Sequence, residues 1–181
     1  LEAAGTKWLA QQSLIRRERA FSADFMITGV WGTDDNNSTT DWDDFTNGDP
    51  FTDVLTAKRT VSNNTGADPN TMTLGYIVHA ALQNHPDIVD RIKHVQIASL
   101  GNVETALSSL FDVSKYLVAK AVYNSANEGQ TMTAAAIIDD DCLISYSSDT
   151  AGLFEASAGY TFTWQGGGGD GEIVEYRDQS V

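Results

Sequence analysis

The sequence predicts an α+β fold. Helical patterns fill most of its first part, beginning with one long amphipathic helix, whereas strand patterns dominate its second part. Strands and helices do not alternate regularly, and no segment is repeated. This order favours an α+β fold over a doubly wound parallel sheet or a solenoid.

The long helix is predicted from Thr6 to Ile27, a segment without Pro or Gly. Leu14, Phe21 and Phe25 recur there at spacings of seven and four residues, which places them on one helical face. A helix of about 20 residues is about 30 Å long, enough to span a domain. We expect this helix to pack along a sheet and to bury the three side chains.

Shorter elements follow with clear boundary signals. Asp49 and Pro50 form an N-cap and a first helical position, and Gly66 ends the helix that they begin. Further helices are expected at 76–84, after Pro86 and at 103–111, and strands at 71–74, 115–122, 135–146, 160–164 and 172–176.

The charge balance excludes several partners. The chain has 25 acidic and 11 basic residues and a net charge of -14, so it repels phosphate backbones and anionic membranes. Its longest apolar stretch, at 134–138, is far shorter than the roughly 20 residues of a membrane helix. We expect neither stable duplex binding nor a membrane span.

No pattern predicts a metal, a cofactor or a catalytic group. Cys142 is the single cysteine and has no partner for an internal disulfide. His79, His85 and His94 are six and nine residues apart, so no two of them lie on adjacent turns of one helix. Neither a Gly-x-Ser-x-Gly elbow nor a Ser-x-x-Lys pair is present.

A glycine pattern near the C-terminus resembles a dinucleotide fingerprint in spacing only. Gly166, Gly168 and Gly171 lead into the strand-like segment 172–176 instead of a helix N-terminus. The helix dipole that binds phosphate would be missing. We interpret this segment as a hairpin loop.

Two acidic segments could offer oxygen ligands to calcium. Asp139, Asp140 and Asp141 are interpreted as a turn between strands. The other segment is flanked by Trp31 and Trp42, but the EF-hand positions for Gly and Glu hold Thr39 and Phe45. We interpret it as a solvated loop, and a calcium- or sugar-binding module remains the alternative of another class. Its acidic residues are Asp34, Asp35, Asp41, Asp43 and Asp44.

Three of the eleven basic residues, Arg16, Arg17 and Arg19, lie within four positions of the long helix. At about 100° per residue, Arg16 and Arg19 share a face and Arg17 diverges from it. A guanidinium pair of this kind fits a carboxylate of another chain. We therefore predict these residues as subunit-interface candidates, against the alternative of a solvated helix face.

Several segments in this order resemble the major capsid proteins of tailed double-stranded-DNA phages and prophages. The similarity runs almost end to end, from the arginine cluster through Thr28-Gly29-Val30-Trp31-Gly32 and Asn70-Thr71-Met72-Thr73-Leu74-Gly75. It continues with Asn84-His85-Pro86-Asp87-Ile88, Leu110-Phe111-Asp112-Val113, Ala121-Val122-Tyr123-Asn124 with Glu128-Gly129, and Ser157-Ala158-Gly159-Tyr160-Thr161-Phe162-Thr163-Trp164.

The resemblance implies the capsid fold named after the Hong Kong 97 phage, in which a long spine helix crosses a peripheral domain and a second, axial domain lies near the capsomer axis. Residues 1–62 and 154–181 would form the peripheral-type domain, and residues 63–153 the axial-type domain. The sequence begins Leu1-Glu2-Ala3 without Met, so we expect a piece of a longer protein that lacks the family's N-terminal arm and extended β-loop.

The resemblance also implies a structural role without catalysis or cofactor. Subunits of this family assemble in the host cytoplasm into pentamers and hexamers, which close into an icosahedral virion shell around double-stranded DNA. The expected partners are copies of the same chain and enclosed DNA that is not bound sequence-specifically. An encapsulin-like compartment subunit, which shares the fold and differs in cargo, is the close alternative.

Overall fold

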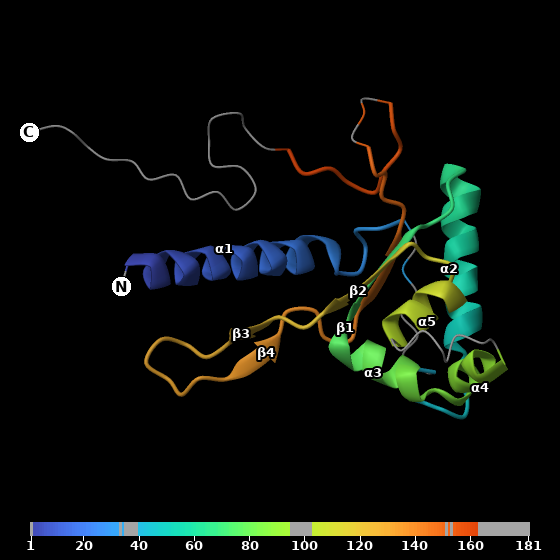
Figure 1. Cartoon of the computed structure of the whole chain (residues 1–181), viewed down its shortest axis with the longest axis horizontal. Coiled ribbons are helices and arrows are strands. Elements are labelled where there is room, and N and C mark those ends of the chain that lie inside the picture. Colours follow the sequence, from blue (N-terminus) through green and yellow to red (C-terminus); the bar gives the residue numbers. More distant parts are fainter. Residues whose placement is uncertain are drawn as a thin grey trace, which may run out of the picture.

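The computed structural model describes residues 2–32, 34, 40–94, 103–150, 152 and 154–162. Over these residues the fold is mixed α and β, as the sequence predicts (Figure 1). The helices are α1 (Glu2–Phe25), α2 (Pro50–Thr65), α3 (Tyr76–Asn84), α4 (Pro86–His94) and α5 (Val103–Leu110). The strands are β1 (Thr71–Gly75), β2 (Lys115–Ala119), β3 (Val122–Asn124), β4 (Ala134–Ala136) and β5 (Cys142–Ser145).

Helix α2 has the ends that its sequence encodes. The Asp49 carboxylate accepts hydrogen bonds from the Thr52 N–H at 3.0 Å and from the Thr52 hydroxyl at 2.6 Å. These bonds lower the pKa of Asp49 below its ordinary value. At the other end, Gly66 takes a left-handed conformation with φ 72° and donates its N–H to the Ser62 carbonyl.

Strand β1 is the centre of a three-stranded sheet. It pairs in parallel with β2, from Thr71 opposite Lys115, and antiparallel with β5, from Thr71 opposite Ser145. Parallel neighbours need a crossover connection, and α3, α4 and α5 lie in the segment that links β1 to β2.

The hydrophobic core lies between this sheet and the helices. Met72 and Leu74 of β1 are fully buried, and each helix from α2 to α5 contributes apolar side chains to their surroundings. The helical and loop members of the cluster are Val54, Val78, Leu82, Ile88, Leu107, Phe111 and Val113. Helix α2 therefore packs into the same core as the segment after it. The division into 1–62 with 154–181 and 63–153 stays a prediction.

Asn70 joins all three strands at one end of the sheet. Its side-chain amide donates to the Ser147 carbonyl at 2.8 Å and accepts from the Ser147 N–H at 2.9 Å, which imitates one more pair of ladder bonds. Its backbone carbonyl accepts from the N–H groups of Ser114 and Lys115. One residue thus fixes the starts of β1 and β2 and the end of β5.

Gly75 determines what happens at the other end of β1. The returning chain passes so close to it that a Cβ atom there would overlap the Asp139 carbonyl. The Gly75 N–H donates to the Asp141 carbonyl at 3.1 Å. Beyond this point β1 no longer separates β2 from β5. The strand after β2, which is β3, therefore pairs directly with the strand before β5, which is β4, from Val122 opposite Ala136 to Asn124 opposite Ala134.

Helix α1 and the β3–β4 hairpin extend on the same side of the core (Figure 1). The predicted long helix is confirmed, although it runs from Glu2 to Phe25 instead of from Thr6 to Ile27, but its predicted packing is wrong. Leu14, Phe21 and Phe25 remain 51%, 38% and 41% exposed, because the three-stranded sheet does not pack against that face. Periodicity identified the face but could not identify what lies against it.

Some strand boundaries also differ from prediction. The expected strand at 135–146 is two strands, β4 and β5, because the backbone bends beside Gly75 over residues 137–141. The expected strand at 115–122 is β2 followed by the first residue of β3. Residues 160–162 are not strand, and 163–164 and 172–176 lie outside the described residues.

Replacing Gly75 by Ala should severely destabilise the fold, because the new methyl group meets rigid backbone at Asp139 and Ile138 instead of a movable side chain. We expect a loss of about 2 kcal/mol or more in the free energy of unfolding. Urea denaturation followed by circular dichroism measures this loss.

The matched control is Gly5→Ala, the same substitution in α1 where nothing lies within 4 Å of the added atom. It should leave unfolding unchanged or slightly stabilise the helix, by up to about 1 kcal/mol. Equal effects of the two substitutions would show that the close approach at Gly75 does not constrain the fold.

Candidate functional site

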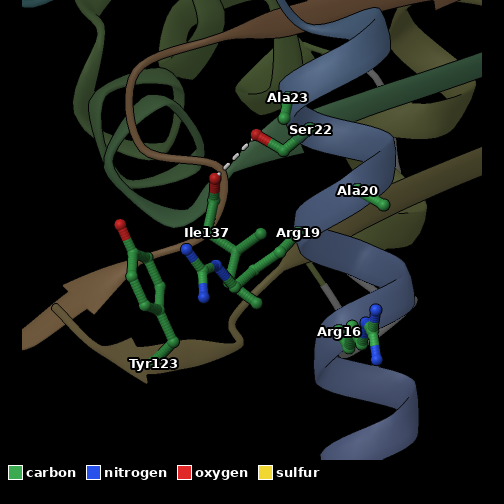
Figure 2. Close-up of a pocket in the computed structure, with 7 residues that line it drawn as sticks. All are labelled: Arg16, Arg19, Ala20, Ser22, Ala23, Tyr123 and Ile137. Carbon is green, nitrogen blue, oxygen red and sulfur yellow. Dashed lines mark hydrogen bonds between the residues drawn. The ribbon is translucent and has the colours of Figure 1, made fainter.

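A cleft of about 410 Å³ opens between α1 and the base of the β3–β4 hairpin (Figure 2). Helix α1 supplies two guanidiniums and several small side chains to it, and the hairpin supplies one aromatic and one aliphatic side chain. The lining residues are Arg16, Arg19, Ala20, Ser22, Ala23, Tyr123 and Ile137.

Two contacts fix the width of the cleft. The Ser22 hydroxyl donates to the Ile137 carbonyl at 2.8 Å, as the dashed line in Figure 2 marks. The Arg19 guanidinium lies over the Tyr123 ring, with its carbon 4.1 Å from the ring centroid. Such a cation–π contact contributes about 0.5–1 kcal/mol at an exposed site and holds the guanidinium in place.

The arginines are placed as their spacing predicts. Arg16 and Arg19 both line the cleft, and Arg17 is not among the lining residues. Their role at a subunit interface stays a prediction. The cleft positions of Tyr123, Ser22 and Ile137 could not be predicted from the sequence, since strand alternation can predict a hairpin but not the helix beside which it lies.

The cleft keeps its positive charge. Neither Arg16 nor Arg19 forms an ion pair with a described residue, although the chain has 25 acidic residues. The described ion pairs instead use lysines, and they join Lys58 to Asp112, Lys93 to Asp90, Lys115 to Asp149 and Lys120 to Glu104. A carboxylate that entered the cleft would meet two guanidiniums that no described carboxylate compensates.

Two described carboxylates of the acidic loop, those of Asp34 and Asp44, hold its own backbone. Asp34 accepts from the Gly29 N–H at 2.6 Å, and Asp44 accepts from the N–H groups of Thr46 and Asn47. The Asn47 side-chain amide, followed by these backbone bonds, lowers the pKa of Asp44. No three His, Cys, Asp or Glu side chains of the described residues are placed to hold a metal ion.

Two histidines are buried in the described structure. His79 is 4% exposed, and its ring nitrogens lie 3.0 Å from the Tyr116 hydroxyl and 2.8 Å from the Gln83 amide nitrogen. Burial lowers the pKa of His79, and burial raises the pKa of Tyr116. His85 is 1% exposed and lies edge-on to Phe45. The side chain of His94 lies outside the described residues.

The remaining predicted features carry no site chemistry in the described structure. Asp139, Asp140 and Asp141 lie in the bend that leads into β5, which confirms the predicted turn. Burial raises the pKa of the Cys142 thiol to about 12, so this thiol is neutral and packs beside the core. Gly166, Gly168 and Gly171 lie outside the described residues.

Comparison with known proteins finds a similarity of fold. No protein-family model and no curated protein matches it. The chain is similar to the crystal structure of a phage-related protein from Bordetella bronchiseptica RB50, with a TM-score of 0.67 and 21% identity. The match covers 86% of this chain and 50% of that protein, so the chain spans about half the length of this neighbour. At this identity the likeness establishes a shared fold.

None of the described helices is long and apolar enough to cross a membrane.

The buried His79 should make the fold less stable in mild acid. Its folded-state pKa lies below the ordinary 6.5, so the unfolded chain binds the proton first as the pH falls. The free energy of unfolding should therefore decrease below about pH 6.5, by at most about 1.4 kcal/mol per pH unit. Urea denaturation between about pH 7.5 and 5.5 measures the slope.

The variant His79→Gln retains polar atoms for Tyr116 and Gln83 but does not titrate, so the slope in this window should decrease. Asp44 and Asp49 have pKa values below 3.8 and do not contribute there. An unchanged slope in His79→Gln would contradict the assignment.

Proposed function

We propose that this chain is part of a structural subunit of an icosahedral phage or prophage capsid. In this role the protein associates with copies of itself into pentamers and hexamers in the host cytoplasm. The resulting shell encloses double-stranded DNA without reading its sequence, and the subunit catalyses no reaction.

The observation that carries the proposal is the uncovered apolar face of α1. Leu14, Phe21 and Phe25 lie on one face of a 24-residue helix, and all three are exposed among the described residues. The Phe21 and Phe25 rings are tilted toward each other with their centroids 5.2 Å apart, and Trp31 continues the row with its ring centroid 6.1 Å from that of Phe25. A contiguous apolar row on a helix is typical of a surface that another protein segment covers.

Two further observations support a capsid over other assemblies. The chain shares its fold with a phage-related protein, and its sequence segments resemble those of phage major capsid proteins. The net charge of -14 also suits a wall that encloses dense DNA, because an acidic wall does not adsorb the DNA it contains. In this proposal α1 is the spine helix of the peripheral-type domain, and the core around β1 belongs to the axial-type domain.

Electron microscopy of the complete gene product, expressed in a bacterial host, tests the proposal. Closed shells built from pentamers and hexamers support it, and DNA inside virions assigns the cargo. Closed shells around an enzyme instead of DNA would indicate a compartment of the encapsulin type. A protein that remains monomeric under all conditions of concentration and salt contradicts a capsid role.

Assembly should depend on the apolar face of α1, which we test with the double substitution Leu14→Gln and Phe21→Gln in the complete protein. Gln has nearly the helix propensity of Leu, so the helix itself should persist. Because neither side chain belongs to the core, the unfolding transition should be nearly unchanged. We expect the yield of shells, measured by sedimentation, to decrease about tenfold or more.

The matched control is Leu55→Gln on α2, a helical leucine that is 47% exposed and lies outside the apolar row. It should leave both assembly and unfolding nearly unchanged. Normal shell yield from the α1 variant would show that the row is not an assembly surface.

A further inference from the structure

The cleft between α1 and the hairpin bears a positive charge that no described residue balances, and a matching negative charge exists elsewhere on the same chain. Several of the described carboxylates already have a partner. Asp44 and Asp49 bind backbone N–H groups, and Asp53 accepts from the Trp42 indole N–H at 2.9 Å. Four more carboxylates form ion pairs with lysines, and these are Asp90, Asp112, Asp149 and Glu104.

The turn formed by Asp139, Asp140 and Asp141 concentrates three carboxylates that have no such partner among the described residues. All three residues are exposed and adjacent in sequence, and none forms an ion pair with a described residue. Partial burial and then the charges of Asp140 and Asp139 raise the pKa of Asp141. Both causes disfavour the charged form of Asp141, and the smaller one is repulsion from the two neighbouring carboxylates.

Two backbone contacts with Gly75 anchor this turn. Gly75 donates its N–H to the Asp141 carbonyl, and the Asp139 carbonyl lies directly over the Gly75 Cα, where a side chain would not fit. Because the turn is already ordered, little conformational entropy is lost when it binds a partner. An anchored acidic turn and a basic cleft of fixed width are complementary in charge.

We infer that this cleft is an interface for a second copy of the chain, in which Arg16 and Arg19 bind the acidic turn Asp139–Asp141 of that copy. Within one chain these arginines and aspartates do not pair. Contact between copies neutralises both patches at once. The inference rests on the proposed self-assembly and names the surfaces that would meet.

Electrostatics favour this contact over a nonspecific one. Copies with a net charge of -14 repel one another at low salt, so association requires the few cations to face carboxylates. Arg19 is held in place by Tyr123, so less side-chain freedom is lost when it binds a carboxylate. Opposite charges at defined positions also determine which orientation of the two copies is allowed.

A complementary charge reversal tests the pairing in the 181-residue chain. The cleft variant carries Arg16→Glu and Arg19→Glu, and the turn variant carries Asp139→Arg and Asp140→Arg. Sedimentation equilibrium up to about 1 mM measures self-association. Each variant alone should associate about tenfold or more weakly than the natural chain. A mixture of the two should regain association, because each cleft then meets a turn of opposite charge.

A matched control reverses charges outside both patches, with Arg59→Glu in one chain and Asp68→Arg in another; both residues are exposed. These chains should associate as the natural chain does, whether alone or mixed. Melting curves of all variants establish that each is folded. If a reversed chain does not fold, Arg16→Gln with Arg19→Gln and Asp139→Asn with Asp140→Asn replace the reversals, and each should weaken association.

Three outcomes would overturn the inference. In the first, the natural chain stays monomeric up to about 1 mM. In the second, the variants associate as strongly as the natural chain, and in the third, the mixture associates no more strongly than either variant alone. A cleft variant that melts at a lower temperature but associates normally would instead show that the cleft binds a segment of the same chain. Shells of normal yield from complete protein that carries the cleft reversal would refute this contact and leave the capsid proposal intact.

Discussion

The close approach of the Asp139 backbone to Gly75 is the contact on which the rest of the architecture depends. It ends β1, so that β3, which follows β2, can pair with β4, which precedes β5, as a hairpin. The hairpin then carries Tyr123 and Ile137 away from the core and against one face of α1. A side chain at Gly75 would move the returning chain and, with it, the wall of the cleft.

Helix α1 therefore presents two different faces. One face meets the hairpin through Ser22 and Arg19, and the other carries the apolar row from Leu14 to Phe25. Most helical stability in proteins comes from packing of an amphipathic face rather than from helix propensity. A helix of 24 residues whose apolar row is exposed therefore fits a subunit that is completed by contact with other chains.

Local signals made much of the fold predictable. Asp49, Pro50 and Gly66 determine the ends of α2 through their own backbone preferences, and the helical period of Leu14, Phe21 and Phe25 correctly indicated α1. The errors concern contacts between distant residues. The bend after β4 depends on Gly75, more than sixty residues away, and the cleft depends on the hairpin lying beside α1. Spacing could place Arg16 and Arg19 on one face, but not Tyr123 opposite them.

Hydrogen–deuterium exchange tests most directly whether α1 is completed by other copies. In dilute monomeric chain the amides of α1 should exchange much faster than those of β1, which lies in the core. In the assembled protein the α1 amides should become protected while those of β1 change little. If α1 is as protected as β1 in the dilute monomer, or is not protected on assembly, the helix does not depend on other copies and this account is wrong.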